Sequence, residues 1–106
     1  MQIEVIHSAF EDQPETVAMV AAPHAVVTEA LEHAYRYTNN VDGSWSRKIG
    51  ADASDTVEVV KPIQNGRGHR STSVGDHMRV DGQLYIVASM GFEKVDEIKD
   101  LFNNSD

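Results

Sequence analysis

The sequence predicts an α+β domain in which a small, mostly antiparallel sheet carries one central helix and a C-terminal helix packed on it. Two observations lead to this prediction. Several apolar or alternating segments have the length of strands and are separated by turn residues, whereas two longer segments repeat their apolar residues at helical spacing. At 106 residues the chain has room for one modest core, so a single domain over residues 1–106 is expected.

The amino-terminal part predicts two strands. Residues 2–6 alternate imperfectly, with apolar Ile3 and Val5 on either side of Glu4, which is typical of a strand. The polar stretch 11–15 contains Pro14 and is expected to be a connection. The short apolar run 16–21 is interpreted as a second strand, with a helical turn as the alternative.

Residues 23–38 predict the central helix. The apolar stripe consists of Val27, Leu31, Ala34 and Thr38, with Ala30 and Tyr35 widening it. Pro23 suits the first turn of a helix because its missing N–H has no partner there. Asn39 and Asn40 follow and tolerate a left-handed exit from the helix.

The middle of the chain predicts a loop, a strand and a turn. Residues 41–55 are rich in Gly, Ser and Asp, and we interpret Trp45 as the buried plug of this loop, with an exposed binding anchor as the alternative. Residues 56–60 alternate and predict a strand that ends before Pro62. The Asn65-Gly66 pair then predicts a turn.

The clearest local pattern is a β-hairpin formed by residues 76–80 and 83–88. Asp81 and Gly82 separate the two strands and both tolerate the positive φ of a type I′ turn. In this register Val80 lies opposite Gln83 and Met78 lies opposite Tyr85. Because both faces of the ribbon are partly apolar, we expect the hairpin to be internal to the sheet.

The last predicted element is a helix over residues 93–102. Its apolar face comprises Val95, Ile98, Leu101 and Phe102. Residues 103–106 are expected to fray.

Composition and charge exclude several classes of protein. The chain has no cysteine, so a disulfide framework, a thiol nucleophile and a cysteine zinc site are excluded. No apolar run is long enough to cross a membrane, and the amino terminus lacks the pattern of a secretory signal, so a cytoplasmic location is expected.

Acidic residues dominate both ends of the chain. Residues 1–35 contain six acidic residues and no Lys or Arg, residues 36–80 contain seven basic against five acidic residues, and residues 81–106 contain two basic against six acidic residues. The net charge of −8 disfavours binding to extended duplex nucleic acid, because that binding depends on Lys and Arg. The acidic ends either keep the protein in solution or attract a basic partner.

One loop concentrates residues that are able to hold an anion. Arginine and hydroxyl side chains donate hydrogen bonds to phosphates and carboxylates, and glycines allow close backbone approach. The candidate ligand-binding residues, within a loop over residues 66–73, are Arg67, His69, Arg70, Ser71, Thr72 and Ser73. The spacing is not that of a phosphate-binding loop, so the alternative is a surface loop in which these side chains, and Asp76 in particular, arrange the local backbone.

No catalytic or metal-binding constellation is predicted. Glu29 and His33 are four residues apart on the central helix, but two ligands do not make a metal site and a solvated pair is the simpler interpretation. Serine, histidine and acidic residues are all present, yet no nucleophile-elbow sequence joins them. We therefore expect no catalytic residue, no cofactor and no enzymatic activity.

The second half of the chain carries a family resemblance. The sequence GHRSTSVGD ends at Asp76 and is followed by a set of turn and aromatic residues: Asp81, Gly82, Tyr85, Gly91 and Phe92. This pattern resembles the YodL-type domain of mobile-element and phage-borne proteins. The upstream sequence ALEHAYRYTNNVDGSWS, which contains Trp45, is similar to a segment of small phage proteins. Gly75 stands where the family has a serine, and Arg70 is additional to the family pattern.

The resemblance implies a phage or mobile-element origin, with the cytoplasm of the host as the location, and carries no known activity. Taken with the charge, it leads us to expect an accessory protein that binds a host or phage protein, as an inhibitor or a mimic of nucleic acid. Two alternatives are an anion- or nucleotide-binding module that uses the loop over residues 66–73, and an oligomeric assembly protein.

Overall fold

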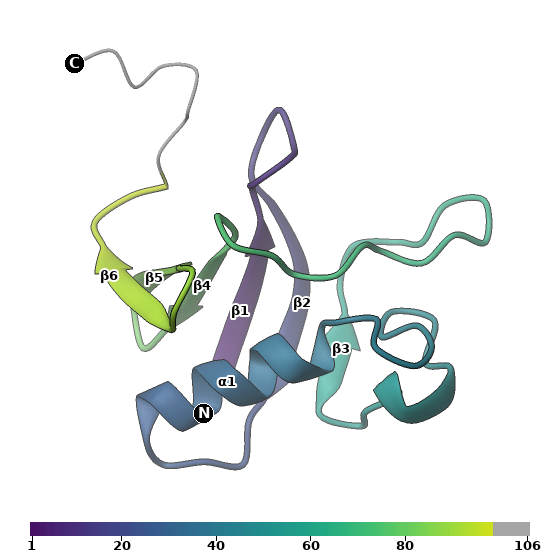
Figure 1. Ribbon diagram of the computed structural model, residues 1–106, viewed down its shortest axis with the longest axis horizontal. Coiled ribbons are helices and arrows are strands. Elements are labelled where there is room, and N and C mark those ends of the chain that lie inside the picture. Colours follow the sequence, from purple (N-terminus) through teal and green to yellow (C-terminus); the bar gives the residue numbers. More distant parts are fainter. Residues whose placement is uncertain (99–106) are drawn as a thin grey trace.

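In the part of the chain that the structure describes, six strands form one antiparallel sheet with the amino-terminal strand near its centre (Figure 1). The computed structural model describes residues 1–98. The strand order is β3-β2-β1-β4-β5-β6, and every pair of neighbours is antiparallel. The strands are β1 (Gln2–His7), β2 (Glu15–Ala21), β3 (Val57–Val59), β4 (His77–Val80), β5 (Gln83–Val87) and β6 (Phe92–Val95).

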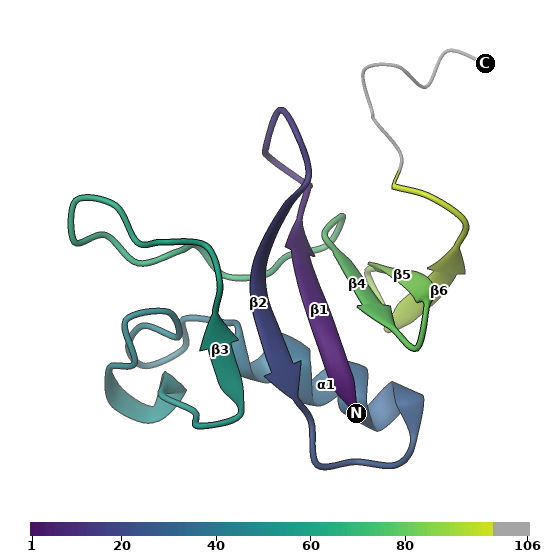
Figure 2. The ribbon, with the colours of Figure 1, turned by 180° about the vertical axis from the view of Figure 1, so that it is seen from behind.

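The helix α1 (Val27–Tyr37) covers one face of this sheet, and within residues 1–98 no α-helix covers the other face (Figure 2). Leu31 of α1 is buried in a core cluster with Ile3, Val5, Val20 and Met78. The strand register explains this cluster, because Val5 lies opposite Met78 on one side and Ile3 lies opposite Val20 on the other. Side chains on one face of neighbouring strands therefore meet the apolar stripe of the helix.

The predicted strands and hairpin are confirmed. The ranges 2–6, 16–21 and 56–60 correspond to β1, β2 and β3, and the hairpin corresponds to β4 and β5. Val80 pairs with Gln83 across a turn in which Asp81 and Gly82 have φ values of 51° and 79°. The hairpin is internal as expected, since β1 pairs with β4 and β6 pairs with β5.

The predicted start of the central helix is wrong, whereas the predicted end, Thr38, is the C-cap residue that follows Tyr37. α1 begins at Val27, because the chain after β2 continues alongside the amino terminus, where Ala22 N donates to Met1 O at 2.8 Å, and Pro23 lies in the connection. At the other end Asn39 has a negative φ and its side chain donates to Tyr35 O at 2.6 Å. The asparagine therefore satisfies a terminal carbonyl with its side chain instead of through a left-handed backbone.

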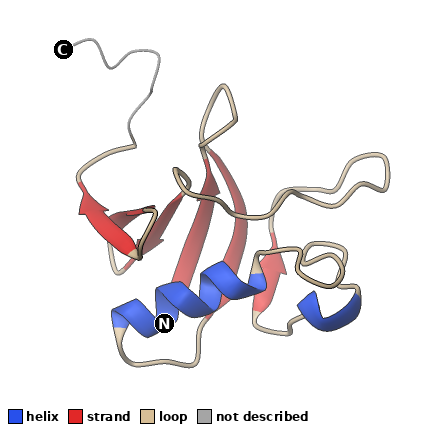
Figure 3. Ribbon diagram, in the orientation of Figure 1, coloured by secondary structure: helices blue, strands red, loops and turns tan. Residues whose placement is uncertain are grey.

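The predicted C-terminal helix is also wrong where the structure describes it (Figure 3). Residues 92–95 form β6, and residues 96–98 are not helical. Gly91 has a φ of 80° and Ala88 N donates to Gly91 O at 2.9 Å, so the chain turns back along β5. The register from Val87 opposite Phe92 to Leu84 opposite Val95 gives these residues backbone partners in β5, so their apolar spacing is not used by a helix. The remainder of the predicted helix, residues 99–102, lies outside the described residues.

Residues 50–52 form a short 3₁₀ helix, η1 (Gly50–Asp52), in the loop between α1 and β3. Over residues 1–98, none of the helices combines the length and the apolar character that crossing a bilayer requires.

Candidate functional site

Residues 68–76, which contain most of the predicted ligand-binding residues, cross the molecule between the Trp45 loop and β4 (Figure 1). Trp45 is fully buried, and its indole Nε1 donates to Arg70 O at 2.9 Å. The interpretation of Trp45 as a buried plug is confirmed. The indole therefore holds the beginning of this crossing segment against the core.

Arg70 is held by two carboxylates within the chain. Its Nη2 and Nη1 donate to the two carboxylate oxygens of Asp76 at 2.7 and 2.8 Å. Its Nε and Nη2 donate to the two oxygens of Glu11 at 3.1 and 2.9 Å. Burial alone would lower the pKa of Arg70, but the hydrogen bonds that it donates to Asp76 and Glu11 raise the pKa above its usual value. The guanidinium fork is thus already occupied, which does not favour anion binding at Arg70.

Asp76 organises two loops at once. Its buried carboxylate accepts hydrogen bonds from the backbone N–H groups of Ser8 and Ala9, both at 2.9 Å, and from Ser73 N at 2.8 Å. Burial would raise the pKa of Asp76, but the bonds from Arg70 and from the backbone lower it below its usual range. The expected role of Asp76 in arranging its local backbone is confirmed, and the structure adds the connection between β1 and β2.

A chain of buried hydrogen bonds runs through Thr72. Thr38 Oγ1 donates to Ala34 O at 2.7 Å, so the 2.8 Å contact between Thr72 and Thr38 assigns Thr72 as the donor. His7 Nε2 lies 2.9 Å from Thr72 Oγ1 and then carries the proton. Burial lowers the pKa of His7 to about 4, so the imidazole is neutral near pH 7. The Thr72 hydroxyl is an internal connector between β1 and the end of α1.

The other predicted ligand-binding residues do not converge on one point. Ser71 Oγ accepts from Asn40 N at 2.8 Å, and His69 N donates to Ser46 Oγ at 2.7 Å. Arg67 is exposed and bridges to Gln64 across the Asn65-Gly66 turn. The segment between β3 and the crossing residues protrudes from the molecule (Figure 1). The structure therefore brings Arg70, Thr72 and Ser73 into the internal network and separates Arg67 from them.

The remaining motif residues serve turns and packing. Gly75 has a φ of 96°, and a Cβ at this position would lie 3.2 Å from Ala9 Cβ, so glycine allows the crossing segment to approach the β1–β2 loop. Tyr85 is half-buried beside the main core. The Phe92 ring lies edge-on to the Tyr35 ring, with centroids 6.3 Å apart.

Sequence reasoning expected a connection at residues 11–15 but did not identify the β1–β2 loop, which we define as residues 8–14, as a candidate site. Phe10 in this loop is 74% exposed, and the guanidinium carbon of Arg70 lies 4.9 Å from the centroid of its ring. Glu11 in the same loop provides the second partner of Arg70. One signal was available in the sequence: a single large aromatic residue stands between a predicted strand and a polar, proline-containing connection.

Within residues 1–98 no three His, Cys, Asp or Glu side chains are placed to hold a metal ion. His33 Nε2 lies 2.9 Å from Thr56 Oγ1, so this histidine bonds across to the segment before β3. Its ring packs against His24 and Tyr37, with centroids 5.4 and 4.7 Å away.

No family model matches this chain, and neither the curated proteins nor the solved structures contain a match to it.

Proposed function

We propose that the protein acts by binding another protein, with the β1–β2 loop as the contact and Phe10 as the anchor. The observation that carries the proposal is the 74% exposure of Phe10 on a backbone that Asp76 holds in place. A large apolar ring in water is unfavourable, and aromatic side chains are enriched among the residues that dominate binding energy.

The loop is ordered before any partner arrives. Ordering a flexible loop on binding costs conformational entropy and weakens the complex. Here Ser8 and Ala9 are bonded to the Asp76 carboxylate, and Arg70 lies beneath the Phe10 ring while it is held by Glu11. The internal network therefore supplies a preorganised platform for an exposed aromatic ring.

The charges support a basic partner. Four basic side chains of the described residues form ion pairs within the chain: Arg36, Lys61, Arg70 and Arg79. Asp12, beside the anchor, is exposed. With a net charge of −8, the outward field is negative and accelerates encounter with a positively charged surface. The partner we propose presents an apolar pocket with a basic rim.

The roles expected from the sequence fit within this proposal. An accessory protein or inhibitor from a phage or mobile element, including one that mimics nucleic acid, needs an acidic surface and a specific anchor. The acidic composition and the position of Phe10 support such a role, and the platform provides the anchor.

Affinity capture from lysate of the source cell tests the proposal. We expect proteins that are retained by the wild-type chain at low salt and released as salt rises, because screening weakens charge attraction. The Phe10→Ala variant is expected to lose them, whereas Gln13→Ala, an exposed change in the same loop, retains them. Retention of the same proteins by both variants contradicts the role of Phe10.

A further inference from the structure

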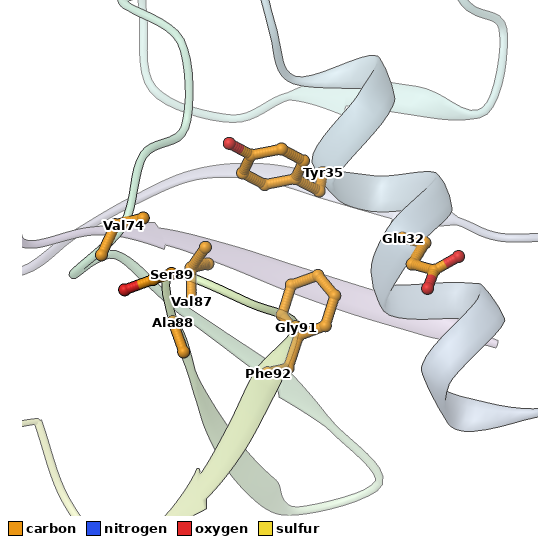
Figure 4. Close-up of a pocket in the computed structure, with 8 residues that line it drawn as sticks. All are labelled: Glu32, Tyr35, Val74, Val87, Ala88, Ser89, Gly91 and Phe92. Atoms are coloured by element: carbon orange, nitrogen blue, oxygen red, sulfur yellow. The ribbon is translucent and has the colours of Figure 1, made fainter.

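A second surface lies away from the β1–β2 loop, where α1 faces the turn between β5 and β6. A pocket of about 250 Å³ opens there, lined mainly by apolar side chains (Figure 4). The residues used below are Glu32, Tyr35, Val74, Val87 and Phe92. Tyr35 and Glu32 project from the helix, and Phe92 projects from the start of β6.

Large apolar side chains are exposed at this pocket. Val74 in its wall is 53% exposed, and Met90, which stands between the lining residues Ser89 and Gly91, is 91% exposed. Exposed apolar side chains gathered around a concavity mark binding surfaces more often than isolated ones do.

The strand beside the pocket has an open edge. β6 is the last strand of the sheet, and within residues 1–98 no strand pairs with its outer side. Ala88 N donates to Gly91 O, whereas Val87 N donates to Asp76 O, so alternate residues of β5 bond to β6. By this alternation the backbone N–H and C=O groups of Phe92 and Lys94 point away from β5 and towards the open edge.

The opposite edge of the sheet differs. There Lys48 Nζ donates to the backbone oxygens of Ser54 and Val57, beside and within β3. The Lys48 ammonium occupies these two backbone oxygens, so they are not free to accept hydrogen bonds from an added strand. Thus the two edges are not equivalent, and β6 is the one that offers backbone groups together with a pocket.

Acidic side chains surround the β6 edge. Glu32 lines the pocket, and Glu93, Asp96 and Glu97 are exposed in and directly after β6. Lys94 is the basic residue among them. An occupant that carries positive charge is therefore favoured.

We propose that β6 accepts an extended, basic segment of a partner protein as an added strand, with one apolar side chain of that segment in the pocket between α1 and β6. Main-chain hydrogen bonds to Phe92 and Lys94 supply the register, and the pocket selects the apolar side chain. This site is independent of the platform around Phe10.

The test uses an eight-residue synthetic peptide that alternates arginine with valine and has one central leucine. We expect it to shift the amide resonances of residues 92–95 and of Val74, and a peptide with glutamate in place of arginine to bind at least about tenfold more weakly. N-methylation of the peptide residues whose N–H groups point towards β6 is expected to abolish binding. N-methylation of the alternate residues is expected to leave the affinity unchanged. This comparison requires no change in the protein.

Two substitutions of Lys94 test whether the peptide pairs with the outer edge of β6. Lys94→Pro removes the outward N–H and is expected to weaken binding about tenfold, whereas Lys94→Ala keeps the N–H and binds at least as tightly as the wild type. Phe10→Ala is expected to bind the peptide normally, which separates this site from the proposed function.

Three results overturn the proposal. They are equal binding of the acidic peptide, equal effects of both methylation patterns, and shifts confined to residues outside β6 and the pocket. Concentration-dependent dimerisation that Lys94→Pro removes, without peptide binding, assigns the edge to a second copy of the chain instead.

Discussion

Residues 68–76 and the β1–β2 loop lie at the same end of the sheet, and neither has the role that its composition indicates. Residues 68–76 contain the arginine, threonine and serines of a binding loop, yet Arg70, Thr72 and Asp76 bond within the chain. The β1–β2 loop has an ordinary composition, yet it exposes Phe10. In this molecule the hydrogen-bonding side chains stabilise the fold, and the side chain that remains exposed for a partner is one that this network does not use.

The largest loss of stability is expected when the Asp76 carboxylate is removed. We expect Asp76→Ala to lower the free energy of unfolding by roughly 3 kcal/mol, because Arg70 and three backbone N–H groups lose their acceptor. Urea denaturation measures this change. The control, Asp12→Ala, removes an exposed acid from the other loop and is expected to change stability by less than about 0.5 kcal/mol. Equal losses in the two variants contradict the assignment.

Acid is expected to destabilise the protein through His7, which is bonded to Thr72 of the crossing segment. The folded-state pKa is about 4 against an ordinary 6.5, so below pH 6.5 the unfolded chain takes up a proton that the folded chain excludes. Stability therefore falls as pH decreases from about 6.5 towards 4, by about 2 kcal/mol between pH 7 and pH 5 for this group. Burial also lowers the pKa of His33 and His77, which adds in the same direction.

Urea midpoints at the two pH values check the contribution of His7. The His7→Gln variant is expected to lose its share of the pH dependence and retain the rest, whereas the exposed change Gln13→Ala, which removes no titratable group, behaves as the wild type. If the free energy of unfolding depends on pH in His7→Gln as it does in the wild type, the His7 imidazole has the same pKa in the folded and unfolded chain, which contradicts the prediction.

A smaller effect is expected at the internal hydroxyl. Thr72→Val keeps the shape of the side chain but removes the partner of His7 Nε2 and the hydrogen bond that the Thr38 hydroxyl accepts. We expect a loss of about 1–2 kcal/mol in thermal or urea unfolding. The neighbouring Ser73→Ala is expected to change stability by less than about 0.5 kcal/mol, because Ser73 contributes its backbone N–H to Asp76. A larger loss in Ser73→Ala would reverse this ranking.

The smallest effect on stability is expected at Phe10. Since the ring is largely exposed, Phe10→Ala should change the free energy of unfolding by no more than about 0.5 kcal/mol. Combined with loss of the captured partner, this result separates binding from folding. A destabilisation above 1 kcal/mol would make Phe10 part of the platform.

Local patterns predicted the parts of the fold that depend on local chemistry. Asp81-Gly82 specified the hairpin through its turn, and the apolar alternation of β1 specified a buried strand. The apolar spacing of residues 93–102 led to a wrong prediction of a helix. Residues 92–95 pair with β5, and a short local pattern does not show that a strand edge is available there. The helix start at Val27 was missed because it depends on a backbone bond between Ala22 and Met1.

The candidate site was predictable only in pieces. A backbone role for Asp76 follows from its neighbours in sequence, but its bonds to Ser8 and Ala9 span more than sixty positions. The pairing of Arg70 with Glu11 likewise depends on β1 lying beside β4. Long-range contacts of this kind decide which arginine is available, and no spacing rule encodes them.

The buried position of Trp45 gives the molecule a built-in optical reporter. It is the single tryptophan of the chain, its Nε1 is bonded to Arg70 O, and the rings of His7 and His69 lie with centroids 6.3 and 5.8 Å away. Detachment of residues 68–76 therefore transfers this indole from an apolar enclosure to water and moves its emission to longer wavelength. Tryptophan fluorescence therefore reports, without any label, whether residues 68–76 remain in place beneath the β1–β2 loop.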